Sequence, residues 1–206
     1  MNGKQWLRPS RRLEGGFTLI EALVTILIVS LGLLGLAGLQ VRMQTSELEA
    51  YQRSQALVLL NDLASRISAN QGNAASYVTS TPIGVGTCTD PGSTAALALK
   101  DLKEWCDAVQ GAGETMSTGS GTGSRVGALI GGRGCVKQLQ AADSTSSAEY
   151  LVTVAWQGLV PLDAPPSAVD CGAGAFNAPS TSGSPCLNDR CRRVLTTVLR
   201  FARSNG

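Results

Sequence analysis

The stretch FTLIEALVTILIVSLGLLGLAGL, residues 17–39, decides the fold because it holds one ionisable side chain, Glu21, in 23 residues. A helix rises ~1.5 Å per residue, so this stretch is ~35 Å long and crosses a bilayer core of ~30 Å. The basic residues before it are Lys4, Arg8, Arg11 and Arg12. The positive-inside rule therefore predicts that residues 1–16 stay cytoplasmic and that the C-terminal part crosses the membrane.

The order of the N-terminal elements differs from that of an ordinary secretory signal. Such a signal has a shorter apolar core, followed by a cleavage site of small residues. Here the apolar stretch is long enough to span a bilayer, and the small residues, Gly15 and Gly16, come before it. This order does not suit the usual signal peptidase.

The helical pattern continues beyond the apolar stretch, since residues 40–70 contain no proline and no glycine. Their apolar positions form a one-sided stripe with helical spacing. These positions are Ala56, Leu59, Leu60, Leu63 and Ile67. The sequence Asn70-Gln71-Gly72-Asn73 is a stop signal. We expect one helix of ~50 residues from about Thr18 to about Ala69, whose amphipathic half packs on residues 71–206.

The remainder predicts a small, loop-rich α+β head. Residues 95–109 have the spacing of a short helix, and residues 73–94, 111–123 and 158–189 are loops rich in Gly, Pro, Ser or Thr. Strands are predicted at residues 125–130, 134–140, 149–157 and 192–201. Gly131-Gly132-Arg133 predicts a hairpin between the first two strands. Four short strands indicate an antiparallel sheet laid on the amphipathic half of the long helix.

Six cysteines follow the apolar stretch: Cys88, Cys106, Cys135, Cys171, Cys186 and Cys191. An even number at wide spacing, after a segment that supplies an export route, predicts disulfides in an oxidising compartment. The short ligand spacings of a zinc site are missing. Among 15 possible connectivities we favour Cys88–Cys106, Cys135–Cys171 and Cys186–Cys191, and the others stay open.

The composition excludes most catalytic templates. The chain has no histidine, which removes Ser-His-Asp and Cys-His sites, histidine-ligated zinc and ordinary haem ligation. The glycine-rich segments at residues 119–125 and 131–134 lack the setting of a phosphate loop. Net charge is only +2. We therefore expect no enzyme, no cofactor, no metal, no small-molecule substrate and no nucleic-acid partner.

Two groups of charged side chains are interpreted as solvated. Alternation along the last strand faces its arginines to water, as an ordinary strand edge, and the alternative is that they bind DNA or an acidic partner surface. These arginines are Arg190, Arg192, Arg193, Arg200 and Arg203. Asp101 and Glu104 are interpreted as exposed charges of the short helix.

The basic leader, Gly16 and the following Phe17-Thr18-Leu19-Ile20-Glu21 resemble the class III signal of type IV pilins and related pseudopilins. The resemblance implies cleavage after Gly16 by the prepilin peptidase and methylation of the new amino group of Phe17. The expected parts are a cleaved leader (1–16), a transmembrane half-helix (17–39), an amphipathic half-helix (40–70) and a periplasmic head (71–206).

The remaining chain resembles the minor pilins of the PilV kind. The segments that carry this resemblance are GLLGLAGLQ at 32–40, DLKEWCDAV at 101–109, GRGCV at 132–136, VTVAWQG at 152–158 and CRRVLTTVLR at 191–200. The proline that major pilins have early in the apolar helix is absent. The resemblance implies a minor pilin that helps to initiate a type IV pilus or is incorporated into it.

Glu21 is the candidate assembly charge. An ionised carboxylate costs roughly 2.5–3.5 kcal/mol at the centre of a membrane and less near its edge. In a packed fibre the carboxylate of one subunit would neutralise the Phe17 ammonium of a neighbour, and this pairing would fix the axial register. The alternative is a carboxylate that is solvated among the lipid headgroups.

The glycines at 32, 35 and 38 indicate either close packing against another membrane helix or a soft stretch. The expected partners are the inner membrane, the prepilin peptidase, other minor pilins and the major pilin. The expected location is the inner membrane, with a single pass, and then the pilus. A minor pseudopilin of a type II secretion system and an adhesin at the pilus tip remain as alternatives.

Overall fold

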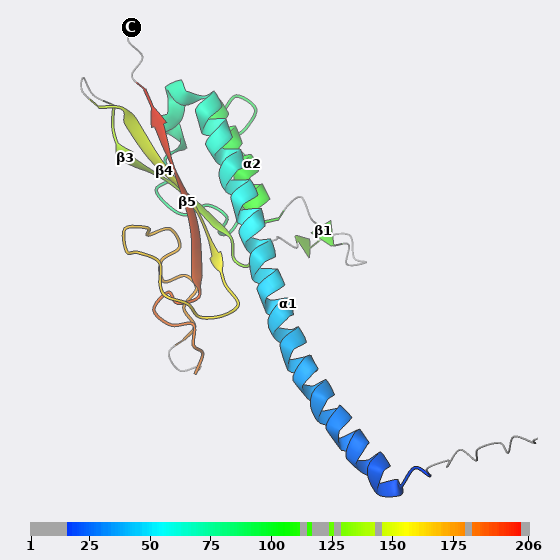
Figure 1. Cartoon of the computed structure of the whole chain (residues 1–206). Coiled ribbons are helices and arrows are strands. Elements are labelled where there is room, and N and C mark those ends of the chain that lie inside the picture. Colours follow the sequence, from blue (N-terminus) through cyan, green and yellow to red (C-terminus); the bar gives the residue numbers. More distant parts are fainter. Residues whose placement is uncertain are drawn as a thin grey trace, which may run out of the picture. The chain divides into compact units, whose positions relative to one another are not determined.

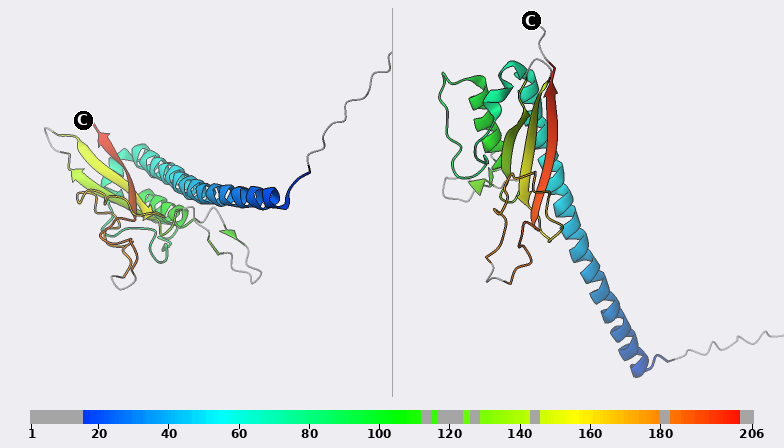
Figure 2. Two further views of the ribbon diagram at one scale, coloured as in Figure 1. Left: turned by 60° about the horizontal axis from the view of Figure 1, so that its bottom comes forward. Right: turned by 90° about the vertical axis from the view of Figure 1, so that its left-hand side faces the viewer.

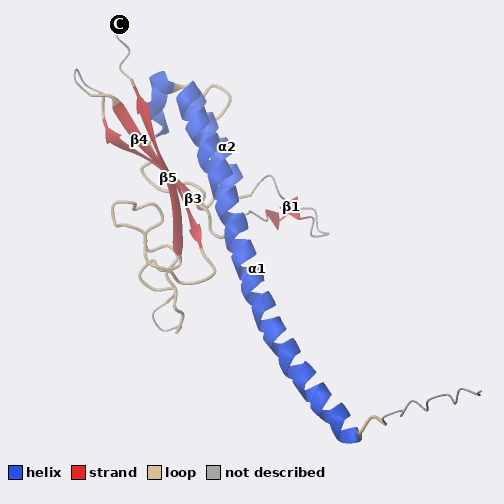
Figure 3. Cartoon of the chain, in the orientation of Figure 1, coloured by secondary structure: helices blue, strands red, loops and turns tan. Residues whose placement is uncertain are grey.

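The computed structural model describes residues 16–111, 115–116, 124–125, 129–142, 146–179 and 183–202. The helices are the α-helix α1 (Leu19–Ala69), the 3-10 helix η1 (Gln71–Tyr77) and the α-helix α2 (Leu97–Val109) (Figures 1 and 3). The strands are β1 (Thr115–Met116), β2 (Ser124–Arg125), β3 (Arg133–Gln140), β4 (Ala148–Gln157) and β5 (Arg192–Phe201). This is the expected α+β fold, with a long N-terminal helix and a small antiparallel sheet.

The chain divides into two compact units, Met1–Gln44 and Thr45–Gly206, and the division falls inside α1. In the first unit the described side chains are almost all exposed. Thr25 Oγ1 donates to Ala22 O (2.9 Å) and Ser30 Oγ donates to Leu27 O (3.1 Å). The hydroxyl groups inside the apolar stretch are therefore satisfied by the helix itself, as an environment without water requires.

In the second unit one face of α1 enters the hydrophobic core. Its buried side chains include Ala56, Leu60, Leu63 and Ile67, while Leu59 is partly buried. They pack in one cluster that also contains Tyr77, Trp105, Val109, Val136, Val152, Val154 and Trp156. The predicted stripe and the predicted end of the helix at Ala69 are confirmed. Each large side chain buried in this way contributes ~1.5–3 kcal/mol.

The larger sheet has the order β3-β4-β5, with both neighbouring pairs antiparallel (Figure 2). Side chains alternate between its faces. Val152, Val154 and Trp156 of β4 point into the cluster shared with α1. Ala155 lies in a second cluster with Cys171 and Phe176 of the loop between β4 and β5. The sheet is thus covered by helices on one face and partly by an irregular loop on the other.

The sequence predicted three strands correctly, at 134–140, 149–157 and 192–201, and one wrongly. The predicted strand at 125–130 ends at Arg125 in the structure, residues 129–130 form a bend and turn, and residues 126–128 lie outside the described part. β2 pairs with β1, not with β3, so the predicted hairpin through Gly131-Gly132-Arg133 is wrong. A turn signal alone does not determine which strand a run of residues joins.

Two predicted loops contain short elements. η1 occupies the beginning of the predicted loop at 73–94, and β1 lies within the predicted loop at 111–123. The rest of that second loop beyond Gly111 lies outside the described residues. The predicted helix at 95–109 is α2, which begins two residues later, and residues 158–189 contain no helix or strand where they are described.

Trp105 of α2 contacts both α1 and β3. Its Nε1 donates to Leu59 O of α1 (2.9 Å), and its ring lies against Gly134 of β3. Gly134 in turn exchanges two backbone hydrogen bonds of 2.9 Å with Ile83. A Cβ on Gly134 would lie 2.2 Å from the ring of Trp105, which is fully buried. Glycine is therefore required at 134 by the close approach of the indole ring.

We predict that Gly134→Ala lowers the free energy of unfolding by about 1–3 kcal/mol, because a buried indole ring has no free space to move into. Denaturant titration of the full chain in detergent measures this change. The matched control is Gly72→Ala, since a Cβ there meets nothing within 4 Å. Equal effects of the two substitutions would contradict the packing described for Trp105.

Candidate processing and assembly site

The helix α1 begins with a local capping arrangement. Thr18 is the N-cap: its carbonyl oxygen accepts the N–H of Ala22 (3.2 Å), and its Oγ1 accepts the N–H of Glu21 (3.3 Å). A threonine cap contributes ~1 kcal/mol. A threonine followed three residues later by glutamate is also the sequence of a capping box. The motif Phe-Thr-Leu-Ile-Glu thus contains its own reason to begin a helix at Leu19.

Gly16 and Phe17 precede the helix and are exposed, with 70% of the surface of Phe17 accessible. A Cβ at Gly16 would meet nothing within 4 Å, so no packing in the described chain requires glycine there. A protease must bring its catalytic groups close to the backbone that it cuts. The fold of this chain does not require glycine at position 16, but the absence of a side chain there would let a protease approach the backbone.

Glu21 is exposed and lies in the first turn of α1. Its negative charge near the positive end of the helix dipole contributes ~0.3–1 kcal/mol. Within the described residues its carboxylate has no hydrogen-bond or ion-pair partner, although its N–H is bonded to Thr18. The carboxylate is thus left available for a cationic group from outside.

The side chains on both sides of Glu21, from Leu19 to Leu39, form a largely apolar surface around the whole helix. Leu19, Leu23, Leu27 and Leu34 each expose more than half of their surface. Among the described helices, α1 alone is long and apolar enough to cross a membrane, judged by length and composition. A Cβ on the glycines at 32, 35 or 38 would meet nothing within 4 Å, so the packing of this chain does not explain them.

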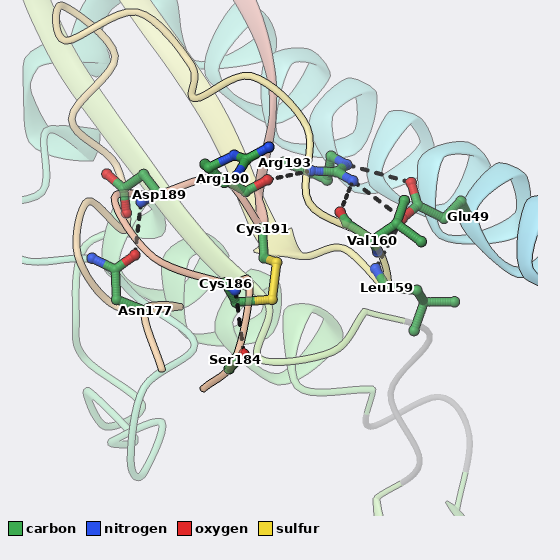
Figure 4. The surroundings of a disulfide bond; sticks show 10 residues. All are labelled: Glu49, Leu159, Val160, Asn177, Ser184, Cys186, Asp189, Arg190, Cys191 and Arg193. Carbon is green, nitrogen blue, oxygen red and sulfur yellow. Dashed lines mark hydrogen bonds and ion pairs between the residues drawn. A yellow bond between two sulfur atoms is a disulfide. The ribbon is translucent and has the colours of Figure 1, made fainter. Parts of the chain in front are cut away.

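In the head, Glu49 of α1 holds the loop that follows β4 (Figure 4). Glu49 Oε1 accepts the backbone N–H groups of Leu159 (2.8 Å) and Val160 (3.2 Å). Arg193 of β5 donates from Nη2 to Glu49 Oε1 (3.2 Å) and to Val160 O (2.6 Å). These residues, which we call the Glu49 clamp, join α1, the loop and β5.

The charge of Glu49 is stabilised within this clamp. Partial burial alone would raise the pKa of Glu49, but the hydrogen bonds from Arg193, Leu159 and Val160 outweigh it and lower the pKa below 4.5. The side chains of Arg193 and Glu49 are 13% and 22% exposed, so water screens the pair only in part. The clamp is therefore ionised at neutral pH.

The neighbouring Arg192 is buried, with 3% of its surface exposed. Its Nη1 donates to Val169 O (2.6 Å) and Cys171 O (3.2 Å). Its Nε lies 3.2 Å from Asp189 Oδ2, an ion pair without the geometry of a hydrogen bond. This charged side chain is buried because it donates to backbone carbonyl groups of a loop, which has no strand partner to bond them.

The interpretation of the C-terminal arginines as a solvated edge is thus wrong for two of them. Arg192 is buried and Arg193 is mostly buried. Arg200 is 72% exposed and pairs with Glu149 (2.8 Å) on the adjacent strand. Arg203 lies outside the described residues. Charge alternation along a strand does not reveal which loop folds over it.

Asp101 is also buried, at 8% exposure, and not the exposed charge expected from the sequence. Tyr77 Oη donates to Asp101 Oδ2, and Arg66 Nη1 donates to Asp101 Oδ1 (3.2 Å). Burial and the bond to Asp101 raise the pKa of Tyr77. Glu104 is exposed as expected, and its Oε2 accepts from Arg66 Nη1 (2.7 Å). The hydrogen bond to Glu104 raises the pKa of Arg66 despite burial.

The structure contains three disulfides, and their pairs are those favoured from the sequence: Cys88–Cys106, Cys135–Cys171 and Cys186–Cys191. The first joins the loop after η1 to α2, and the second joins β3 to the loop between β4 and β5. The third closes a short turn before β5. A bridge of this kind contributes ~2–4 kcal/mol, and more where the closed loop is longer.

Comparison with known families gives two adjoining matches. Residues 11–37 match the family model of the prokaryotic N-terminal methylation motif, and residues 38–110 match the family model described as Type IV pilin Tt1218. No curated protein and no solved structure matches the chain. Together the two matches cover residues 11–110, which contain α1 and α2, and over these residues the chain is similar to type IV pilins. Type IV pilins are structural proteins and not enzymes.

We predict that Glu49→Gln lowers the free energy of unfolding at pH 7 by about 1–2 kcal/mol, because charge-assisted hydrogen bonds are lost. The folded pKa of Glu49 is lowered, so its contribution is complete above pH 4.5 and is lost as the pH falls through the folded pKa. Denaturant titrations of wild type and Glu49→Gln, from pH 7 to below pH 4.5, measure this loss.

The matched control is Glu47→Gln, two residues earlier on an exposed position of α1. This control keeps the change in net charge and removes no contact of the Glu49 clamp. A constant difference between wild type and Glu49→Gln from pH 7 to well below 4.5 would contradict the role of the Glu49 charge.

Proposed function

We propose that this chain is a minor type IV pilin that helps to initiate a pilus or is incorporated into it. The observation that carries the proposal is the combination of a matched N-terminal methylation motif with a long helix whose first half is apolar and exposed all round. Such a helix needs a membrane or other helices around it. A pilin uses both in turn, first as a membrane protein and then as a subunit of a fibre.

Processing comes first in this proposal. The prepilin peptidase cuts after Gly16, and the new amino group of Phe17 is then methylated. Two observations support this step: Gly16 and Phe17 are exposed and non-helical, and no packing within the described chain requires Gly16. The N-cap at Thr18 keeps the helix from extending back over the bond to be cut.

Assembly follows through Glu21. Removal of the leader creates an ammonium group on Phe17, while the carboxylate of Glu21 has no partner in the described chain. Two such ions in an apolar environment attract strongly, and each is costly when alone. We propose that Glu21 of one subunit pairs with the Phe17 ammonium of its neighbour, which fixes the axial position of the incoming helix.

The assignment as a minor subunit rests on the head. The segments DLKEWCDAV, GRGCV, VTVAWQG and CRRVLTTVLR resemble those of PilV-type minor pilins, and the early proline of major pilins is absent. In the structure these segments form α2, β3, β4 and β5 around one core. In our proposal this arrangement presents the head to other minor pilins and to the major pilin.

The proposed location is the inner membrane, with a single pass and the head in the periplasm, before transfer to the pilus. The basic leader favours this orientation. Three disulfides and no free cysteine among the described residues support an oxidising compartment for the head. The energy for assembly would come from a separate ATPase.

We predict that Glu21→Leu still inserts and is still cleaved, but enters filaments at least tenfold less than wild type. Sheared pili and membranes are compared by immunoblotting, with processing followed by the size of the chain. Glu47→Leu serves as the control for loss of a carboxylate on α1. Normal incorporation of Glu21→Leu would contradict the pairing with the Phe17 ammonium.

The function itself is tested by deletion of the gene, followed by assays of surface pili and of type II secretion. We expect loss of pili with secretion intact, restored by the wild-type gene. Loss of secretion with pili intact would instead assign the chain as a minor pseudopilin, whose N-terminal signal is the same.

A further inference from the structure

The strand β5 leaves one edge of the sheet open. It pairs with β4 alone in the described structure, and the right-hand view of Figure 2 shows it as the outermost strand. The hydrogen bond from Gly158 N–H to Cys191 O (2.7 Å) shows which residues of β5 direct their backbone groups toward β4. Since antiparallel pairs alternate, the odd-numbered residues of β5 bond to β4 and the even-numbered ones face away.

The outward backbone groups therefore belong to Val194, Thr196, Val198 and Arg200. None of them has a backbone partner within the described residues. The even-numbered Arg192 is consistent with this pattern, because its backbone N–H points away from β4 and donates to Asp189 O (3.0 Å).

This edge lacks the usual protection against pairing with another chain. Proteins protect edges with prolines, bulges, short strands or unpaired charges. β5 has ten residues, no proline and no glycine, and its pairing with β4 runs without a bulge. The charge of Arg200 is already paired with Glu149 (2.8 Å), and Val198 is 44% exposed. The sequence and structure of β5 thus favour addition of a strand.

A groove lies beside the first half of this edge. It has a volume of about 200 Å³ and is lined by Glu49 and Arg53 of α1, by Arg193, Val194 and Leu195 of β5, and by Trp156 and Leu162. Glu49, one turn before Arg53, is engaged by Arg193, Leu159 and Val160. Arg53 is exposed and has no ion pair or hydrogen bond within the described residues.

We propose that β5 and this groove bind an extended segment of another protein, which adds to the sheet as a fourth strand and places a carboxylate on Arg53. Backbone bonds to the even-numbered residues of β5 would hold the segment. An apolar side chain beside the carboxylate would enter the groove against Leu195 and Leu162. Charge complementarity with Arg53 selects an acidic segment over a neutral or basic one.

A second copy of β5 does not meet these requirements. The strand sequence RRVLTTVLRF contains three arginines and no carboxylate. Pairing of β5 with itself would leave Arg53 without an anion and would bring arginines of both copies to one edge. The partner strand therefore comes from a different sequence. This inference does not depend on the assignment as a minor pilin.

The test uses the full chain in its own cells, with a photo-reactive amino acid in place of Thr196 and, as a control, in place of Leu97, which is 59% exposed on α2. Cross-linked peptides are mapped by mass spectrometry in piliated and non-piliated cells alike. We expect a link from position 196, and none from position 97, to one segment that contains Asp or Glu.

Two pairs of variants test whether the cross-link depends on the free edge of β5 and on the charge of Arg53. Val198→Pro removes an outward N–H that β4 does not use, and Arg53→Glu reverses the charge in the groove. Both should reduce the link at least tenfold, while Val198→Thr and Arg53→Lys retain it. Intact disulfides and unchanged protease resistance check folding. Where Val198→Pro fails this check, Arg53→Glu decides.

The proposal is overturned by any of three results. One is no link from position 196 above that from position 97. Another is a link that Arg53→Glu, or a folded Val198→Pro, leaves unchanged. The third is a linked segment that is β5 of a second copy or that lacks a carboxylate. Because the cross-link is mapped in non-piliated cells as well, its outcome is separate from that of the gene deletion, which alone tests the proposed function.

Discussion

The distribution of apolar side chains along α1 is the constraint on which the rest of the structure depends. From Leu19 to Leu39 the helix carries apolar side chains on all sides, with Glu21 as its one ionisable group, and the described residues leave it exposed. From Thr45 onward one stripe is buried beneath α2 and the sheet. The first half therefore needs a membrane or neighbouring helices, and the second half organises the head. The two family-model matches, over residues 11–37 and 38–110, together include both halves of this helix.

The loop between β4 and β5 is held to the head by contacts that do not depend on regular secondary structure. The loop between β4 and β5 is fixed by the Glu49 clamp, by buried Arg192, by the Cys135–Cys171 bridge and by Lys137, which lies 3.1 Å from Asp170. Such contacts satisfy loop backbone that no ladder reaches.

Local signals made much of this fold predictable. Three patterns depend only on residues close together in the sequence. They are the apolar stretch, the stripe from Ala56 to Ile67, and the alternation in β3, β4 and β5. The failures at the charged residues are non-local. The burial of Asp101, Arg192 and Arg193 depends on residues far away in the sequence, as with Glu49 and Arg193, which are separated by 144 residues. A sequence pattern shows that a side chain is charged, but not that a distant loop will cover it.

We propose that the chain becomes functional by a cut between Gly16 and Phe17, which creates the ammonium group that Glu21 neutralises. The most direct test is mass spectrometry of the N-terminal peptide of the protein isolated from membranes and from pili. We expect a peptide that begins at Phe17 and carries a methyl group on its amine. A peptide that begins at Met1, or at any position within the apolar stretch, would contradict it.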